Sequence, residues 1–368
     1  MYIGLVIYGS LDTISGGYLY DRELVAHLQR QGEQVEVISL PWRSYPHHLA
    51  DNFSTALLRR LAGEPFDLLL EDELNHPSLA LLNHRLKKLA RYPVISIVHH
   101  LRISERHPPL PRALYRTVEC RYLASCDGFI FNSQTTRAVV ESLVGGTRPS
   151  VVAYPAGSRL RATPPEPGQI SARLAGADRL RIVFVGSLIP RKGLHTLLDG
   201  LALLPSRGWH LDVVGSPAAD PAYARRIQRR IQSLGIGGRV SLHGPLPDPD
   251  LHALLMNSHL LCVPSSYEGF GIVYLEGMAC GLPAIATTAG AAHEIVEDGV
   301  TGFLVPPEDP AVLSRRLNDL LTDRGRLFKM SLTASERFAS HPTWEQTTAR
   351  IHRFLRSWAG DLDRLPDL

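Results

Sequence analysis

Two glutamates, Glu268 and Glu276, stand eight positions apart in the segment YEGFGIVYLEGMACGLP, residues 267–283. Burying a carboxylate without a partner is costly, so acids within this apolar run need an explanation. If a helix begins between them, their carboxylates lie up to about 12 Å apart along its axis. That span suits a sugar nucleotide, with its diphosphate at the free N–H groups of the helix start. The structural alternative makes Glu268 a helix N-terminal charge and Glu276 a solvated side chain.

A basic pair, Arg191 and Lys192, follows another apolar run in VGSLIPRKGL, residues 185–194. Arg offers a fork of hydrogen-bond donors and Lys a compact charge, and both suit a phosphate group. The pair adjoins Gly193, at a point where a strand passes through a loop into a helix. The alternative is a solvated basic turn, which is common in loops.

Two further motifs follow apolar runs in the first half of the chain. Gly16 and Gly17 open an amphipathic segment and would let a phosphate or sugar approach the backbone, although a plain tight turn is the alternative. Their spacing is not that of the dinucleotide fingerprint, so NAD is not predicted. His99 and His100 follow SIV, and a histidine there can donate to a sugar hydroxyl or stabilise developing charge.

No metal site is predicted from these motifs. The histidine pair has no acidic or Cys partner at ligand spacing in the sequence. Two D-x-D patterns, residues 248–250 and 361–363, resemble motifs with which some transferases hold a divalent ion. The first coincides with a predicted helix start, where Asp248 is expected to be the N-cap, and the second lies in the tail. Both are therefore interpreted as structural.

The elements that would position these residues alternate along the whole chain, as in parallel sheets covered by helices. Apolar runs predict strands at residues 2–8, 34–40, 66–71, 93–98, 128–132, 150–155, 180–186, 210–215, 240–244, 260–265, 283–287 and 302–305. Amphipathic segments predict helices near 18–31, 78–91, 111–125, 193–204, 220–234, 249–257, 271–280, 291–296 and 310–322, with another in the tail.

This order predicts two doubly wound α/β domains in tandem. Such sheets bind ligands beyond the carboxyl ends of their strands, so two facing domains would form a cleft. The predicted organisation is a first domain at 1–160, a Pro- and Gly-rich linker at 161–178, a second domain at 179–340 and a C-terminal helix within 341–368.

Composition sets the class of protein. The chain has 368 residues, 44% of them hydrophobic and 20% charged, which is typical of a globular enzyme of two domains. Four cysteines form no C-x-x-C pair, and the start carries no basic signal-peptide region, so a reduced, cytoplasmic protein is expected. No apolar stretch approaches 20 residues, so any membrane contact is expected to be peripheral, on the inner face.

One segment, residues 80–122, is strongly basic. It holds nine Lys or Arg and two Glu, a net +7 in a chain of net charge +3. Two interpretations stay open: a face for an anionic membrane or a phosphorylated lipid, or solvated helix surfaces. Nucleic acid is not expected, because no aromatic residues interleave the arginines at 225, 226, 229 and 230.

Taken together, these motifs resemble those of glycosyltransferase family 4, retaining enzymes of the GT-B architecture. The motifs that carry the resemblance stand in family order over residues 180–310: RKGL, VVGSP, RVSLHG, PSSYEGFGIVYLEGMACGLP, AGAAHEIV and DGVTGFLVPPEDP. The N-terminal half is similar more loosely, through its glycine pair and the histidine after SIV. The resemblance implies two Rossmann-like domains facing across a cleft, with a C-terminal helix that crosses back to the first domain. It also implies that the N-terminal domain binds the acceptor and that the C-terminal domain binds the nucleotide sugar.

The resemblance also implies roles for particular residues. Glu276 would hold the ribose of the donor, Glu268 the donor sugar, and the basic pair the diphosphate. The implied catalytic residues are His99, Arg191, Lys192 and Glu268. The implied donor-binding residues are Gly17, Gly186, Arg191, Lys192, Glu268, Gly269, Phe270, Gly271, Ile272 and Glu276. The family works without a metal, so neither a metal nor another cofactor is expected.

The expected activity is transfer of a hexose, with retention, from a UDP-sugar first or a GDP-sugar second to a hydroxyl acceptor: a lipid, a polysaccharide or a small molecule. Two departures, Ala291 after Gly290 and His100 after the family histidine, leave the sugar and the acceptor open. The alternatives are a sugar-nucleotide epimerase of the same architecture and a non-catalytic sugar-nucleotide-binding protein. The sequence does not specify an oligomeric state.

Overall fold

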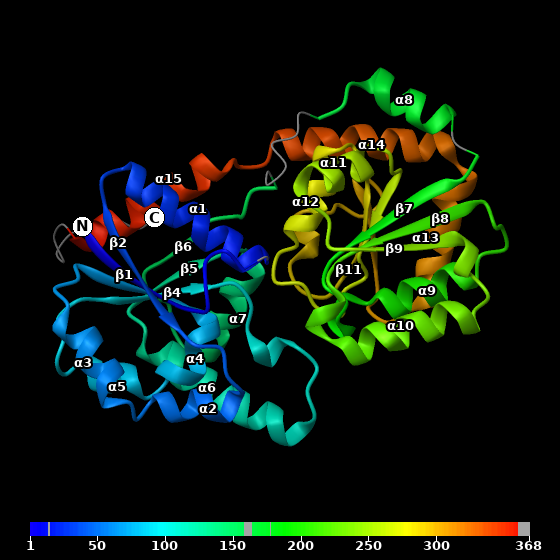
Figure 1. Ribbon diagram of the computed structural model, residues 1–368. Coiled ribbons are helices and arrows are strands. Elements are labelled where there is room, and N and C mark those ends of the chain that lie inside the picture. The colour runs from blue at the N-terminus through cyan, green and yellow to red at the C-terminus, as the bar shows by residue number, and fades with distance from the viewer. Residues whose placement is uncertain (14, 158–163, 177, 360–368) are drawn as a thin grey trace. The chain divides into compact units, whose positions relative to one another are not determined.

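The protein is described here by a computed structural model that places residues 1–13, 15–157, 164–176 and 178–359. The chain divides into two compact units (Figure 1). The first comprises Met1–Pro155 and Pro342–Leu368, and the second comprises Ala156–His341.

The first unit is built on a six-stranded parallel sheet with the strand order β2-β1-β3-β4-β5-β6. Its central strands are nearly continuous apolar runs, because helices cover both faces. The strands are β1 Tyr2–Tyr8, β2 Gln34–Leu40, β3 Leu68–Asp72, β4 Val94–Val98, β5 Gly128–Phe131 and β6 Ser150–Val152. The strand order reverses between β1 and β3, so a ligand site is expected near the loops that follow these two strands.

Helices flank this sheet on both sides. In Figure 1, α1 and α15 lie next to each other, and α2, α3, α5 and α6 lie on the opposite side of the sheet. The helices are α1 Gly16–Arg30, α2 Tyr45–Asp51, α3 Thr55–Gly63, α4 His76–Leu79, α5 Leu82–Leu86, α6 Pro109–Ser125, α7 Gln134–Val144 and α15 Trp344–Ala359. Two 3₁₀ turns, η1 Glu73–Asn75 and η2 Arg102–Ser104, follow β3 and β4.

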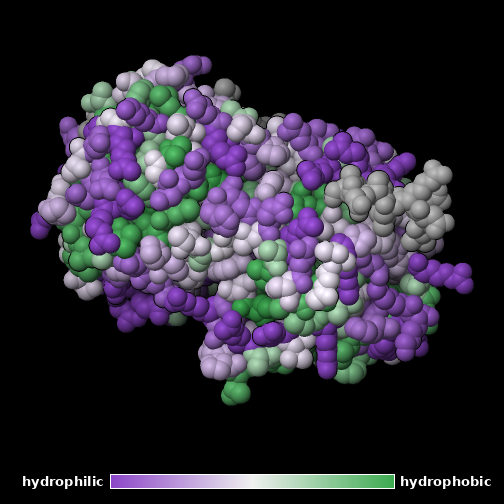
Figure 2. Space-filling view, turned by 180° about the vertical axis from the view of Figure 1, so that it is seen from behind, coloured by the Kyte–Doolittle hydropathy of each residue, from purple (hydrophilic) through white to green (hydrophobic). Residues whose placement is uncertain are grey.

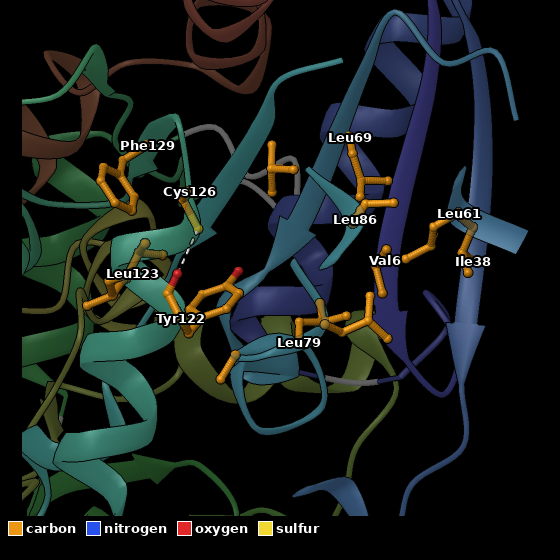
Figure 3. Close-up of a cluster of buried hydrophobic side chains, with 14 of the residues drawn as sticks. Val6, Ile38, Leu61, Leu69, Leu79, Leu86, Tyr122, Leu123, Cys126 and Phe129 are labelled. Carbon is orange, nitrogen blue, oxygen red and sulfur yellow. Dashed lines mark hydrogen bonds between the residues drawn. The ribbon is translucent and has the colours of Figure 1, made fainter. Parts of the chain in front are cut away.

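A buried apolar cluster joins the sheet to α4, α5 and α6 (Figure 3). Val6 and Leu69 project from the sheet toward Leu79 and Leu86 of the short helices, and Tyr122 and Leu123 enter from α6. Packing of this kind supplies most of the free energy that fixes such helices on a sheet.

The second unit has its own six-stranded parallel sheet, in the order β12-β11-β10-β7-β8-β9. The strands are β7 Leu180–Val185, β8 Trp209–Val214, β9 Val240–Gly244, β10 Leu260–Cys262, β11 Ala284–Thr287 and β12 Gly302–Val305. The helices are α8 Pro167–Ala175, α9 Leu194–Ala202, α10 Pro221–Ser233, α11 Asp248–Met256, α12 Ile272–Ala279, α13 Pro310–Thr322 and α14 Arg324–Ala339. Strand order reverses between β7 and β10.

The predicted fold class is confirmed: each of the twelve predicted strands is present, in two Rossmann-like sheets. The tail helix α15 packs against α1 in the first unit, as predicted. Thr347 on this helix donates to the carbonyl of Tyr154 at 2.7 Å. Glu33, in the α1–β2 connection, accepts from His352 at 2.7 Å and from Arg356 at 3.1 Å, and it also pairs with the amino group of Met1.

Several helix predictions are wrong. The helix expected near 78–91 is two short helices, because the Asn52 side chain accepts from the N–H groups of Leu81 and Leu82 at 2.7 and 3.2 Å where α5 begins. The segment at 291–296 holds only a 3₁₀ turn, η6 Ala292–Glu294. Asp248 is the first residue of α11 and Pro247 is the N-cap. Five helices, α2, α3, α7, α8 and α14, lie in segments for which the sequence pattern predicts no helix.

The predicted linker, residues 161–178, lies partly outside the described residues. Its described part contains α8, a helix with a capping box between Glu166 and Gln169, which contacts α14 in the second unit. The D-x-D pattern at 361–363 also lies outside the described residues. Within the part of the chain that the structure describes, no helix has the length and apolar character needed to span a membrane.

Candidate active site

The strand-order reversal in the second unit brings together the two loops that the sequence analysis singled out. Arg191 and Lys192 lie in the 3₁₀ turn η3 Pro190–Lys192 after β7, and Glu268 lies in the loop after β10. Gly193 closes η3 with a φ of +72°, and a Cβ there would lie 2.0 Å from the carbonyl oxygen of Pro264. Only glycine allows the two loops to approach so closely.

Glu268 is the centre of an ion-paired cluster with this basic pair. Its Oε2 accepts from Lys192 Nζ at 2.7 Å, and its Oε1 lies 3.9 Å from Arg191 Nη1. Arg191 also donates to the carbonyl of Tyr267 at 3.1 Å. Glu268 is buried, with 8% of its surface exposed, so these charges are largely shielded from water.

Ser265 also binds the Glu268 carboxylate. Its hydroxyl donates to Glu268 Oε2 at 3.0 Å, and its carbonyl accepts from Thr287 at 2.6 Å. Burial alone would raise the pKa of Glu268, but Lys192 and Arg191, with the hydrogen bonds from Lys192 and Ser265, lower it to about 2. Glu268 is therefore ionised at neutral pH and holds both cations in place.

Close backbone packing also fixes the main chain at Glu268. Its carbonyl accepts from the N–H of Ala291 at 2.8 Å. A Cβ on Gly290, where φ is +82°, would lie 2.1 Å from the same carbonyl oxygen. Gly186 lies beside the Lys192 side chain, whose methylene carbons are 3.6–3.7 Å from the position of a Cβ there. Gly290 thus lets the loop that carries Glu268 pack against the neighbouring loop.

Helix α12 begins directly after this cluster, as predicted. Gly271 is its N-cap with a φ of +101°, and Ile272 is its first residue, where backbone N–H groups have no acceptor within the helix. Gly269 and Phe270 connect Glu268 to this helix start, and the buried Phe270 ring lies 5.9 Å from that of His341. The positive end of α12 is therefore adjacent in sequence to the Arg191–Glu268–Lys192 cluster.

Glu276 lies one turn further along α12, where it is buried with 6% of its surface exposed. The structural alternative that treats Glu276 as a solvated side chain is therefore wrong. Glu268 also differs from a simple helix N-terminal charge, because two basic side chains pair with it.

In the first unit, His99 follows β4 and is buried against α1. Its Nε2 lies 3.0 Å from Asp21 Oδ1, and a Cβ on Gly17 would lie 3.3 Å from its ring. The ring of Tyr20 meets the imidazole edge-on at 5.1 Å, and Asn132 donates to the His99 carbonyl at 2.8 Å. The structure thus brings together two of the predicted residues, Gly17 and His99. His100 points elsewhere, with its Nε2 2.9 Å from Glu105.

A second carboxylate, Asp72, joins Asp21 and His99. One ligand atom from each of these three residues lies within 4.8 Å of the others. Burial lowers the pKa of His99, but Asp21, Asp72 and Glu73 outweigh it and raise the pKa to about 9. Burial, together with the charge of Asp21, raises the pKa of Asp72. His99 is therefore a cation at neutral pH.

No acidic residue stands at ligand spacing from the histidines in the sequence, but the fold brings Asp21, 78 residues distant, next to His99. A second buried group, Glu73, His76 and Glu119, also has ligand atoms within 4.8 Å of one another. Its two carboxyl groups favour the protonated form, because burial raises the pKa of Glu73 to about 8 and that of Glu119 to about 7. The expectation that the reaction needs no metal stays a prediction.

Sequence reasoning missed Asp21, Asp72 and Ser265. Asp21 carried a signal, because it lies three residues from Tyr18 and from Leu24 on the buried face of α1. Asp72 carried a weaker one, since it ends a strand of five buried residues. Nothing in the sequence around Ser265 distinguishes it from its neighbour Ser266.

Comparison with known proteins follows the same division of the chain. Residues 16–156 match the family described as Glycosyltransferase Family 4, and residues 169–337 match Glycosyl transferases group 1. The chain belongs to glycosyltransferase family 4. The family resemblance that was predicted from the motifs is thereby confirmed.

Relatives with a known name include the D-inositol 3-phosphate glycosyltransferase of Thermobispora bispora, 31% identical over 69% of this family 4 chain and 61% of the relative. The protein of that name from Xylanimonas cellulosilytica is 29% identical over 63% of this chain and 57% of its own. The chain therefore spans about 60% of the length of these two relatives.

Solved structures share the fold of this family 4 chain. Sucrose-phosphate synthase from Thermosynechococcus elongatus has a TM-score of 0.81 at 24% identity, covering 96% of this chain and 98% of its own. Anabaena HepE in complex with UDP-glucose has a TM-score of 0.75 at 22% identity, covering 97% and 100%. WaaG, a glycosyltransferase involved in lipopolysaccharide biosynthesis, has a TM-score of 0.72 at 17% identity, covering 98% and 100%.

Proposed function

We propose that this family 4 chain transfers a sugar, with retention and without a metal, from a nucleoside diphosphate sugar to a hydroxyl acceptor. The observation that carries the proposal is the Arg191–Glu268–Lys192 cluster at the strand-order reversal, directly before the N-terminus of α12. Two oriented cations and a helix N-terminus suit a diphosphate leaving group, and they supply the positive charge that a metal supplies in other enzymes.

In the proposed reaction, the bond between the sugar C1 and the diphosphate oxygen breaks while a bond from C1 to the acceptor oxygen forms on the same face. The acceptor proton passes to the leaving phosphate, so no enzyme carboxylate has to act as nucleophile. This role for the phosphate contrasts with the paired carboxylates of retaining glycosidases. Glu268 keeps the cations oriented before the donor binds and is placed to accept from a donor hydroxyl afterwards. Glu276 is assigned to the ribose diol.

UDP is the proposed nucleotide and GDP the second candidate. The likeness to HepE, whose structure contains UDP-glucose, supports this choice. For the acceptor we propose a polyol phosphate, because relatives of this chain are named for inositol 3-phosphate. The acceptor is assigned to the first unit.

A thermal shift experiment tests the donor assignment. UDP, GDP, ADP and their common sugars are added to the wild type and to Glu276→Ala. Stabilisation by one nucleotide that is lost in Glu276→Ala would support the site. If no nucleotide shifts the wild type, a non-catalytic protein or an unusual donor is favoured. Interconversion of the free donor sugar without an acceptor would favour the epimerase.

Arg191→Ala and Lys192→Ala are each expected to lower kcat by about 100-fold or more, because charge builds on the leaving diphosphate in the transition state. Initial rates at saturating donor measure this, with the exposed Arg225→Ala on α10 as the control. Full turnover by Arg191→Ala would contradict its role. Activity retained after dialysis against EDTA would support a reaction without a metal.

A further inference from the structure

In the first unit, the side chain of Arg102 packs against two adjacent tyrosine rings. Its guanidinium carbon lies 4.4 Å from the centre of the Tyr115 ring and 5.2 Å from that of Tyr45. The two rings are themselves 4.7 Å apart and nearly perpendicular. Stacking on aromatic faces orients a guanidinium without using its N–H donors.

Most N–H donors of the Arg102 guanidinium make no hydrogen bond with the described residues. The guanidinium has one long contact, 3.5 Å from Nη2 to the Tyr115 hydroxyl, and it makes no ion pair with any residue in the described part of the chain. Glu119 lies nearby, but its oxygens accept from the backbone N–H groups of Arg102 and Ile103 at 2.6 and 3.0 Å. Glu119 thus holds the backbone at Arg102 and Ile103 and makes no hydrogen bond with the Arg102 guanidinium. Arg191, in contrast, already faces a carboxylate.

The position of this cluster is that of a ligand site. Tyr45 begins α2 after β2, Arg102 begins η2 after β4, and Tyr115 lies in α6, the helix that follows η2. The loops at the carboxyl ends of parallel strands are where such sheets bind ligands. His107 braces the loop, because its Nε2 lies 2.9 Å from the Arg102 carbonyl and its ring meets Tyr115 at 4.8 Å.

The surroundings are basic and exposed. Of the two acids among residues 80–122, Glu119 is buried and Glu105 faces His100, so neither neutralises Arg102. Large apolar side chains are exposed nearby on α6, with Leu110 at 86% and Leu114 at 47%. Figure 2 shows the molecule from behind, with hydrophobic residues exposed between hydrophilic ones.

We propose that Tyr45, Arg102 and Tyr115 bind the phosphate of the acceptor, a phosphomonoester or phosphodiester carried by a polyol. This inference rests on the proposed function and gives the acceptor a subsite. The guanidinium would bind the phosphate through two parallel N–H···O bonds, and the Tyr115 hydroxyl would add a neutral donor. The Tyr45 hydroxyl lies 3.3 Å from His76 Nε2, so Tyr45 contributes its ring. The same chemistry fits a soluble polyol phosphate and the head group of a phospholipid, and the experiment distinguishes them.

The experiment uses the full chain as wild type, Arg102→Gln and Arg239→Gln. Arg239 is a matched control, since its guanidinium lies 4.2 Å from the Trp209 ring centre but precedes β9, at the amino end of a strand. Calorimetry measures binding of inositol 3-phosphate and of inositol. The wild type is expected to bind the phosphate and not inositol, with Kd raised roughly 10- to 100-fold in Arg102→Gln and unchanged in Arg239→Gln.

Sedimentation with vesicles of phosphatidylinositol in phosphatidylcholine, and of phosphatidylcholine alone, forms the second arm. Binding to the phosphatidylinositol vesicles that is lost in Arg102→Gln would support the proposal and would assign the site to a lipid head group. Equal binding of every probe by Arg102→Gln and the wild type would overturn the proposal, and so would a wild type that binds none. A UDP thermal shift in all three proteins separates this failure from failure of the donor site.

Discussion

His99 owes its charge to the carboxylates that surround it. With its Nε2 turned to Asp21, the other ring nitrogen, Nδ1, makes no hydrogen bond with the described residues. An imidazolium in this state has one N–H that can point at a ligand, and it carries a full positive charge. At the residue scale, Asp21 therefore determines which ring nitrogen, Nδ1, is left to donate to a ligand.

The charge of His99 predicts a pH dependence. Since Asp21 and its neighbours raise the pKa of His99 to about 9, its proton is present below pH 9 and lost above it. With the catalytic role that the family resemblance implies for His99, kcat/KM should fall as the pH rises through about 9. Asp21→Asn removes the largest favourable interaction with the imidazolium, so the fall should move to lower pH.

Rate profiles between pH 6 and 10 measure this shift, and NMR titration of the His99 ring gives a readout that is independent of activity. Asp12→Asn in the loop before α1 is the control and should leave the profile unchanged. A profile that is identical in Asp21→Asn and the wild type would show that His99 does not depend on this partner.

At the scale of elements, the strands were predictable and several helices were not. Most strands are short apolar runs, and the turn residues at both ends of such a run favour a strand over a helix. The break between α4 and α5 depends on Asn52, a residue about thirty positions away that the local sequence does not reveal. Helix α8 was hidden because Pro and Gly around it are typical of a linker, although Pro167 suits a first helical position.

The candidate site divides in the same way. Glu268, Arg191 and Lys192 could be predicted because each stands in a strand–loop–helix segment with a recognisable pattern. Their pairing could not, since it depends on the order of the strands in the sheet. The Arg102 cluster could not be predicted either, because it assembles side chains from three connections.

Helix α15 gives the prediction at this scale. Glu33 anchors it through His352 and Arg356, and these bonds, with the bond to the amino group of Met1, outweigh burial and lower the pKa of Glu33 to about 2. Glu33→Gln should reduce the free energy of unfolding by about 1–3 kcal/mol at pH 7. Denaturant titration measures it, with the exposed Glu297→Gln as the control.

The sign of the pH effect follows from the lowered pKa. The contribution of Glu33 is complete above pH 4.5, the ordinary value for a glutamate, and is lost as the pH falls toward 2. The difference between the wild type and Glu33→Gln should therefore shrink in acid. A constant difference down to pH 3 would contradict the assignment.

At the scale of the whole molecule, other buried carboxyl groups have the opposite effect to Glu33, because they make the folded chain more stable in acid. Glu71, Asp72 and Glu73 follow one another at the end of β3, each with at most 1% of its surface exposed. Burial raises the pKa of Glu71 to about 7 and that of Glu73 to about 8, and burial likewise raises the pKa of Glu119 to about 7. The folded chain therefore holds protons that the unfolded chain releases above pH 4.5.

Stability should consequently be highest in mild acid and should fall as the pH rises from about 5 to 8. Each proton contributes a slope of up to about 1.4 kcal/mol per pH unit. Denaturant titrations at pH 5.5, 7 and 8.5 measure the slope, and Glu73→Gln should flatten it while Glu297→Gln should not. A wild type that is equally stable at all three values would show that these carboxylates are ionised in the folded state.

The ion pairs of Glu268 have a consequence for selectivity among small anions. The two cations face the Glu268 carboxylate, so any anion that binds them must compete with it. Inorganic phosphate, a single small anion, gains little from such an exchange. A nucleoside diphosphate sugar adds contacts along its whole length, and those contacts favour the exchange. Under the proposed function, the cluster would therefore favour a nucleoside diphosphate sugar over inorganic phosphate.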